Sequence, residues 1–138
     1  MAVPQRLTVV TVGAHSVPLL RAFYRAIGWR ENDGSDDTYT SFTLGSARLA
    51  LYPMERLHDE AAPGKDLVAP GAWNGVTFTV NVGTREEVDD AVTAAVNAGA
   101  TAVASPVARD WGGYSGYFAD PEGRRWEIAW APFFADFE

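Results

Sequence analysis

The chain lacks cysteine, has only two histidines, and contains neither a run of basic residues nor a long apolar segment. The absence of cysteine excludes disulfide bonds, thiolate metal sites and cysteine nucleophiles. Because the formal net charge is −7, the surface repels nucleic acid and anionic membranes, and neither is expected as a partner. No segment approaches the roughly 20 apolar residues of a membrane span, and no signal-peptide pattern is visible. We therefore expect a cytoplasmic protein.

The composition is typical of a globular domain. Hydrophobic residues make up 47% and charged residues 21% of the 138 residues, which is close to the average of folded proteins. The length lies within the usual range of one domain, about 100 to 200 residues. We expect residues 1–138 to form a single domain with its own core.

The first half of the chain, about residues 5–53, predicts a strand, a helix and a hairpin. A β-branched run is followed by a helix with a serine N-cap and a glycine stop, and then by two strands joined by a two-residue turn. The predicted elements are a strand at 7–12, a helix from Ser16 to Ile27, and strands at 39–44 and 48–52. Residues 54–72 are rich in proline and glycine and predict a linker.

The second half, about residues 73–132, repeats this order. Thr84 and Glu87 form a capping-box pattern at the start of a helix that stops at Gly99. The predicted elements are a strand at 75–80, a helix at 85–97, and strands at 101–103, 114–119 and 124–130. A displacement of about seventy residues superimposes the first strands of the two halves, which indicates an internal duplication.

Alternation along the strands divides the sheet into two faces. In residues 75–80 the apolar side chains alternate with small or polar ones, and in residues 124–130 Glu127 shares a face with Arg125 and Ala129. This pattern predicts helices on one face and a partly polar concavity on the other, although a solvent-exposed face would give the same alternation. The predicted core comprises Val10, Val12, Phe23, Val76, Phe78, Val80, Val88, Val92, Trp126 and Ile128.

Residues 111–130 resemble the signature of a known protein superfamily. The run Trp-Gly-Gly-Tyr-Ser-Gly-Tyr-Phe-Ala-Asp-Pro-Glu-Gly-Arg-Arg-Trp-Glu-Ile-Ala-Trp closely resembles the C-terminal signature of the glyoxalase/bleomycin-resistance/extradiol-dioxygenase proteins, the vicinal-oxygen-chelate superfamily. Phe23-Tyr24 and Gly28-Trp29 look like the signature of its first module. The resemblance implies an α+β fold in which paired βαβββ modules form an eight-stranded, cup-shaped mixed sheet with helices on its outer face.

Glu127 is the most informative residue, because a carboxylate within an apolar run must be paired, solvated or shifted in its pKa. In metal-binding members of the superfamily the matching glutamate is a metal ligand. The other three ligand places fall near Val9, Ala50 and Gly75, which cannot donate to a metal. One carboxylate is short of the three protein ligands that a catalytic metal site normally uses. We therefore predict no metal and no cofactor.

Three functions remain open. The first is a metal-free binder of a small aromatic or hydrophobic molecule, like the resistance proteins of the superfamily. The second is a glyoxalase-like lyase or isomerase that uses Glu127 as a general base or as the sole metal ligand supplied by the protein. The third is a purely structural or regulatory domain, in which the aromatic cluster forms core or a dimer interface. We favour the first and leave open whether the chain is an enzyme. The predicted ligand-binding residues are Thr11, Thr77, Thr79, Trp111, Tyr114 and Tyr117, and the catalytic candidate is Glu127.

The two histidines and Ser115 do not supply another catalytic scheme. His15 follows the first strand and His58 lies in the predicted linker, so both are expected to be surface residues. Ser115 lacks the strand context and the histidine base of a nucleophile elbow. No glycine-rich stretch has the spacing of a phosphate-binding loop.

We expect a homodimer, because the superfamily resemblance and an aromatic C-terminus both favour association. The rings concerned are Trp130, Phe133, Phe134 and Phe137. Light scattering on the purified protein at micromolar concentration should give twice the chain mass of 14.9 kDa. A mass of one chain would contradict this prediction.

Overall fold

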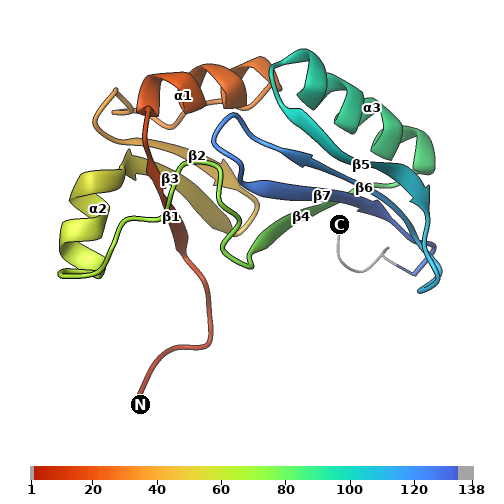
Figure 1. Ribbon diagram of the computed structural model, residues 1–138. Helices are drawn as coiled ribbons and strands as arrows, with labels where there is room; N and C mark the ends of the chain where they lie inside the picture. Colours follow the sequence, from red (N-terminus) through yellow and green to blue (C-terminus); the bar gives the residue numbers. More distant parts are fainter. Residues whose placement is uncertain (1, 134–138) are drawn as a thin grey trace. The chain divides into compact units, whose positions relative to one another are not determined.

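The computed structural model describes residues 2–133, which divide into two compact units between Val68 and Ala69. Each unit has its own mixed sheet (Figure 1). The division falls inside the segment that the sequence predicts as a linker. None of the helices in residues 2–133 combines the length and apolarity that a membrane crossing requires.

The first unit contains three strands and two helices. Its sheet has the order β1-β3-β2, in which β3 pairs in parallel with β1 and antiparallel with β2. The elements are β1 (Val9–Ala14), α1 (Val17–Ala26), β2 (Thr40–Leu44), β3 (Ala47–Pro53) and α2 (Met54–Ala61).

Helix α1 forms where the sequence predicts it. The hydroxyl of Ser16 accepts a hydrogen bond from the backbone N–H of Leu19 at 3.2 Å, which caps the helix. Tyr24 stacks on Trp29 with ring centroids 5.2 Å apart, and both rings contact Phe42 of β2. These aromatic contacts fasten the helix to the sheet.

Part of the predicted linker is helical, which corrects the sequence-based description of residues 54–72. Residues 54–61 read Met-Glu-Arg-Leu-His-Asp-Glu-Ala, and most of these residues favour helix. Helix α2 packs against β1 and β3. Gly13 permits this approach, because a Cβ atom there would lie 2.5 Å from Sδ of Met54.

The second unit contains four strands and one helix in the order βαβββ. Its sheet has the order β4-β7-β6-β5, with β4 and β7 parallel and the other pairs antiparallel. The elements are β4 (Thr77–Asn81), α3 (Arg85–Asn97), β5 (Thr101–Ala108), β6 (Tyr114–Ala119) and β7 (Arg125–Trp130). In both units the first strand pairs in parallel with the last, which supports the internal duplication.

The predicted eight-stranded sheet is wrong in strand number, since residues 2–133 form seven strands in two sheets. The first unit has no strand that corresponds to β5. In its place, residues 29–37 form one isolated antiparallel bridge with β2, between Glu31 and Phe42. This segment is rich in Asp, Asn, Ser and Gly, which are disfavoured or weak in strands.

The helix face of the second sheet is apolar. Helix α3 packs against β5, β6 and β7 (Figure 1). The side chains of Phe118, Trp126 and Ile128 are buried, and Phe78 contacts Trp126 at 4.9 Å between ring centroids. The capping interaction of Thr84 is present, with its hydroxyl 3.1 Å from the backbone N of Glu87.

Four predicted core residues are less buried than expected. Val76 is 48% exposed because it precedes β4 instead of lying within it. Val10, Phe78 and Val80 are partly buried. Among the C-terminal aromatic residues, Phe133 is exposed, whereas Phe134 and Phe137 lie outside the described residues.

Adjacent leucines on α1 test the packing of the first unit. Leu20 is fully buried and Leu19 is 48% exposed. We expect Leu20→Ala to lower the free energy of unfolding by about 2–5 kcal/mol, because it leaves a cavity. Leu19→Ala is the matched control and should change stability by about 0.5 kcal/mol or less. Equal losses in urea unfolding would mean that α1 is rotated about its axis.

Candidate functional site

Three polar side chains form a row across the second sheet, on the face that α3 does not cover. Glu127 lies on β7 between Thr79 of β4 and Tyr117 of β6, and it is paired with both in register. The Thr79 hydroxyl donates to Oε1 of Glu127 at 3.0 Å, and the Tyr117 hydroxyl donates to Oε2 at 3.0 Å. Both carboxylate oxygens therefore have a donor, which fixes the orientation of the group.

The turn before β7 sets this register. Oδ1 of Asp120 accepts hydrogen bonds from the backbone N–H groups of Glu122 at 2.9 Å and Arg124 at 3.0 Å. Gly123 adopts φ +91°, and a Cβ atom there would lie 2.6 Å from the backbone of Gly71. A shift by one residue in this turn would move Glu127 to the helix face.

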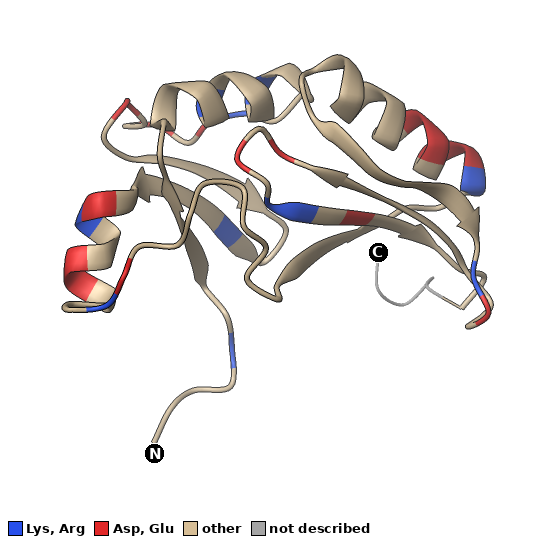
Figure 2. Ribbon diagram, in the orientation of Figure 1, with Lys and Arg blue, Asp and Glu red and all other residues tan. Residues whose placement is uncertain are grey.

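Glu127 is one of few charged residues in the strands of the second sheet. Strands β4 to β7 contain only two charged residues, Arg125 and Glu127, whereas acidic residues gather in the first turn of α3 (Figure 2). Arg125 shares the face of Glu127, and its Nη1 donates to the carbonyl oxygen of Gly123 at 2.8 Å. The negative charge of Glu127 is thus separate from the cluster of acidic residues on α3.

Tyr117 has an altered acidity. Burial raises the pKa of its phenol, and the hydrogen bond to Glu127 and the negative charge of that group raise it further. The guanidinium of Arg109 opposes these effects, since its positive charge favours the phenolate. Arg109 lies 5.7 Å from the centre of the Tyr117 ring. The phenol is therefore held in its protonated form as a donor to Glu127.

The structure places several of the predicted site residues in this row or beside it and puts Tyr114 on the other face of the sheet. Thr77 shares the face of Thr79 one step along β4, and Trp111 lies in the β5–β6 turn and is 44% exposed. Tyr114 is on the opposite face, where its hydroxyl donates to Asp89 of α3 at 2.6 Å. Thr11 belongs to β1 of the other unit.

Sequence reasoning missed Arg109, which follows β5. Its Nε donates to Oγ of Ser115 at 2.9 Å, and its Nη2 donates to the carbonyl oxygen of Ser115 at 3.0 Å. It also missed Asn81 at the end of β4, whose Oδ1 is buried without a hydrogen-bond partner in the described residues. The only available signal was position, since both residues stand at strand ends.

Glu127 is the only carboxylate of the polar row, which contains no imidazole. Its two oxygens already accept hydrogen bonds, and its row partners are hydroxyl groups. No group of three or more His, Cys, Asp or Glu side chains comes together within residues 2–133. His15 is exposed in the turn after β1, and His58 lies on α2 with its ring beside the carbonyl oxygen of Lys65.

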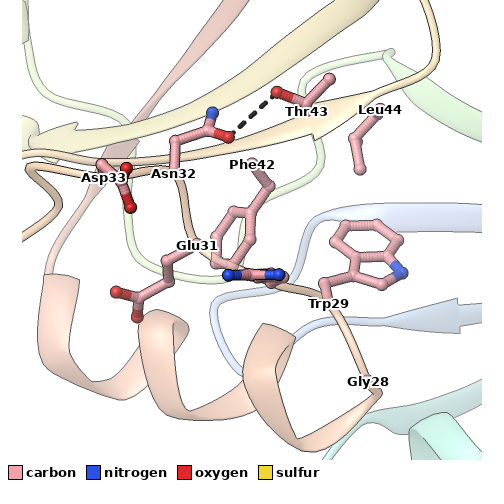
Figure 3. Close-up of a pocket in the computed structure, with 9 residues that line it drawn as sticks. Gly28, Trp29, Glu31, Asn32, Asp33, Phe42, Thr43 and Leu44 are labelled. Atoms are coloured by element: carbon pink, nitrogen blue, oxygen red, sulfur yellow. Dashed lines mark hydrogen bonds between the residues drawn. The ribbon is translucent and has the colours of Figure 1, made fainter.

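A hollow lies in the first unit, where the strand equivalent to β5 is missing. It is a cavity of about 580 Å³ between residues 28–33 and 42–44 (Figure 3). Oδ1 of Asn32 accepts a hydrogen bond from the Thr43 hydroxyl at 3.0 Å across it. Its floor includes the fully buried ring of Phe42.

Glu31, one of the two acidic residues that line this cavity, has a structural role. Glu31 forms a bidentate pair with Arg21, at 3.0 Å to Nε and 2.7 Å to Nη2. The hydrogen bonds from Arg21 lower the pKa of Glu31, and the charges of Arg21 and Arg25 add to the effect. Glu31 thus joins α1 to the segment that replaces the missing strand.

Comparison with known proteins identifies related folds. A family model described as a glyoxalase-like domain matches residues 9–129. No curated protein matches the chain. A glyoxalase-related enzyme from Fulvimarina pelagi has a similar structure, with a TM-score of 0.82, 25% identity, and coverage of 94% of this chain and 90% of that chain.

Two further structures share the fold at lower identity. A glyoxalase/bleomycin resistance protein/dioxygenase family enzyme from Burkholderia phytofirmans has a TM-score of 0.77 and 20% identity over 90% of this chain and 97% of that chain. A lactoylglutathione lyase from Agrobacterium tumefaciens has a TM-score of 0.69 and 20% identity over 96% of this chain and 98% of that chain. At this identity the similarity concerns the fold alone.

The hydrogen bond between Tyr117 and Glu127 can be tested by titration. We expect Glu127→Gln to lower the pKa of Tyr117, because it removes a charge that disfavours the phenolate. Tyr114 is the internal control, since the pKa of its phenol is raised by its hydrogen bond to Asp89. NMR of tyrosines labelled with carbon-13 at Cζ resolves the two titrations. An unchanged Tyr117, or an equal shift in Tyr114, would contradict the geometry.

Proposed function

Because the chain belongs to the glyoxalase-like domain family of the vicinal-oxygen-chelate superfamily, we propose that it binds a small aromatic or hydrophobic molecule without a divalent metal. The observation that carries this proposal is the row Thr79–Glu127–Tyr117. It supplies fixed hydroxyl and carboxylate groups on a sheet face that the helix of its unit does not cover. A few polar groups in fixed positions among apolar surface are typical of small-molecule sites.

The neighbouring residues support the aromatic or hydrophobic character of the ligand. The ring of Tyr117 lies on this face and is partly buried, and Val107 is 45% exposed opposite Ser115. Trp111 in the adjacent turn presents a second exposed ring. Aromatic side chains provide a large contact area with few rotatable bonds.

The alternative is a lyase or isomerase in which Glu127 acts as a general base. The fold does not decide between binding and catalysis. The same site residues serve both functions, so that binding and turnover must be measured on the same variants. A general base must reach the proton it removes, and Glu127 would do so while still held by Thr79 and Tyr117.

The proposal predicts that Glu127→Gln abolishes ligand binding, or turnover if there is any, with little loss of stability. A thermal-shift screen of aromatic and polycyclic compounds identifies the ligand, since a ligand at 100 times its Kd adds about 2.7 kcal/mol to the stability of the wild type. Glu86→Gln, on the exposed first turn of α3, is the control and should bind as the wild type does.

Chelation provides the second arm of this experiment. Binding should persist after treatment with a chelator, and elemental analysis should find no stoichiometric metal. Tightly held metal, or a ligand lost on chelation, would overturn the metal-free proposal. Unchanged binding in Glu127→Gln would reduce Glu127 to a structural hydrogen-bonding residue.

A further inference from the structure

The guanidinium of Arg109 is fixed beside the polar row. Two hydrogen bonds to Ser115 hold it, and Ser115 is fully buried, so the anchor itself does not move easily. The backbone of Arg109 is held too, because its N–H donates to the carbonyl oxygen of Gly113 at 2.8 Å. The cation also lies over the ring of Tyr117 at 5.7 Å. Side chain and backbone are both positioned before any ligand binds.

Arg109 has no counter-ion within residues 2–133. Within these residues the guanidinium contacts Ser115 and the ring of Tyr117, and neither group is a carboxylate. The carboxylate of the row, Glu127, accepts from two hydroxyls and forms no ion pair with Arg109. By contrast, Arg21 is paired with Glu31. A partly buried cation without a counter-ion is unfavourable unless another group supplies the negative charge.

Arg109 and Asn81 lie at the same end of the strands, on the two outer strands of the sheet. Strands β4, β5 and β7 run in one direction, and they end at Asn81, Ala108 and Trp130. Asn81 is paired with Ala129, and Ala129 is paired with Ser115. Asn81 therefore shares a face of the sheet with Ser115, the residue that holds Arg109. This end of the sheet therefore carries the guanidinium of Arg109 on one side and, on the far strand, a buried amide oxygen that has no donor within the described residues.

We propose that Arg109 recognises an anionic group of the ligand, and that the ligand is an aromatic carboxylic acid or a similar small organic anion. This inference rests on the proposed binding function. The planar guanidinium keeps Nη1 for the ligand, since Nη1 has no partner within the described residues, and a fixed guanidinium suits the planar geometry of a carboxylate.

The test compares matched probes that differ only in charge. NMR titration measures the Kd of 2-naphthoate and of the neutral 2-naphthamide for the wild type, Arg109→Gln and Arg109→Lys. We expect the wild type to bind the carboxylate at least tenfold more tightly than the amide, about 1.4 kcal/mol. Arg109→Gln should bind the two equally. Arg109→Lys, which keeps the charge without the planar fork, should retain part of the preference.

Arg85→Gln is the matched control on the other face of the sheet. Arg85 lies over the rings of Tyr114 and Trp130 at 5.5 Å and 5.2 Å, so that its loss removes an equivalent stacked cation away from the row. This variant should keep the preference for the carboxylate. Loss of the preference in Arg85→Gln as well would indicate an effect of net charge and would overturn the role of Arg109.

The remaining outcomes separate this inference from the proposed function. Equal binding of amide and carboxylate by the wild type, or an undiminished preference in Arg109→Gln, would overturn the anion site and leave small-molecule binding intact. If Arg109→Gln does not fold, the anion site is still tested by the Kd values of the carboxylate and the amide for the wild type and for Arg109→Lys. Binding of neither probe at millimolar concentration, together with no hit in the compound screen, would overturn both.

Discussion

The register between β7 and its two neighbours is the constraint on which the candidate site depends. In a sheet, successive side chains point to opposite faces, so a single register assigns every residue of β7 to one side. Glu127 falls between Thr79 and Tyr117, while Trp126 and Ile128 fall on the helix face and are buried. The same packing that buries the two apolar side chains presents the carboxylate on the opposite face. The register of β7 therefore determines both the burial of the apolar side chains and the position of the carboxylate.

The two duplicated units share a strand pairing but differ in the side chains at matching positions. In the first unit the corresponding register pairs Thr11 of β1 with Ala50 of β3, and Ala50 with Ser41 of β2. Ala50 thus stands where the second unit has Glu127. The parallel pairing of first and last strands is common to both, but the row in the first unit has no carboxylate. The polar row of the second unit is therefore a property of a few side chains and not of the strand order.

Much of the fold could be predicted from the sequence, because its signals are local. Helix α3 and strand β6 begin and end where predicted, and the caps at Ser16 and Thr84 are present. Helix α2 was missed because proline and glycine in the rest of residues 54–72 outweighed a run of eight residues, most of which favour helix. The eighth strand was expected by resemblance, and the turn-forming residues of 29–37 prevent it. Alternation also assigned Glu127 to the correct face.

The candidate site was less predictable, because its contacts join residues that are far apart in the sequence. Thr79 and Glu127 are 48 positions apart, and Tyr114 was grouped with Tyr117 although an odd spacing of three places them on opposite faces. The Thr79–Glu127–Tyr117 row satisfies its own hydrogen bonds, so by itself it could serve the sheet alone. The unsatisfied groups are at the strand ends, where Arg109 lacks a counter-ion and Asn81 lacks a donor within the described residues. Buried polar groups are rarely left unpaired without a reason. The row therefore supplies a fixed polar surface, and Arg109 beside it is the residue that can distinguish an anionic ligand from a neutral one.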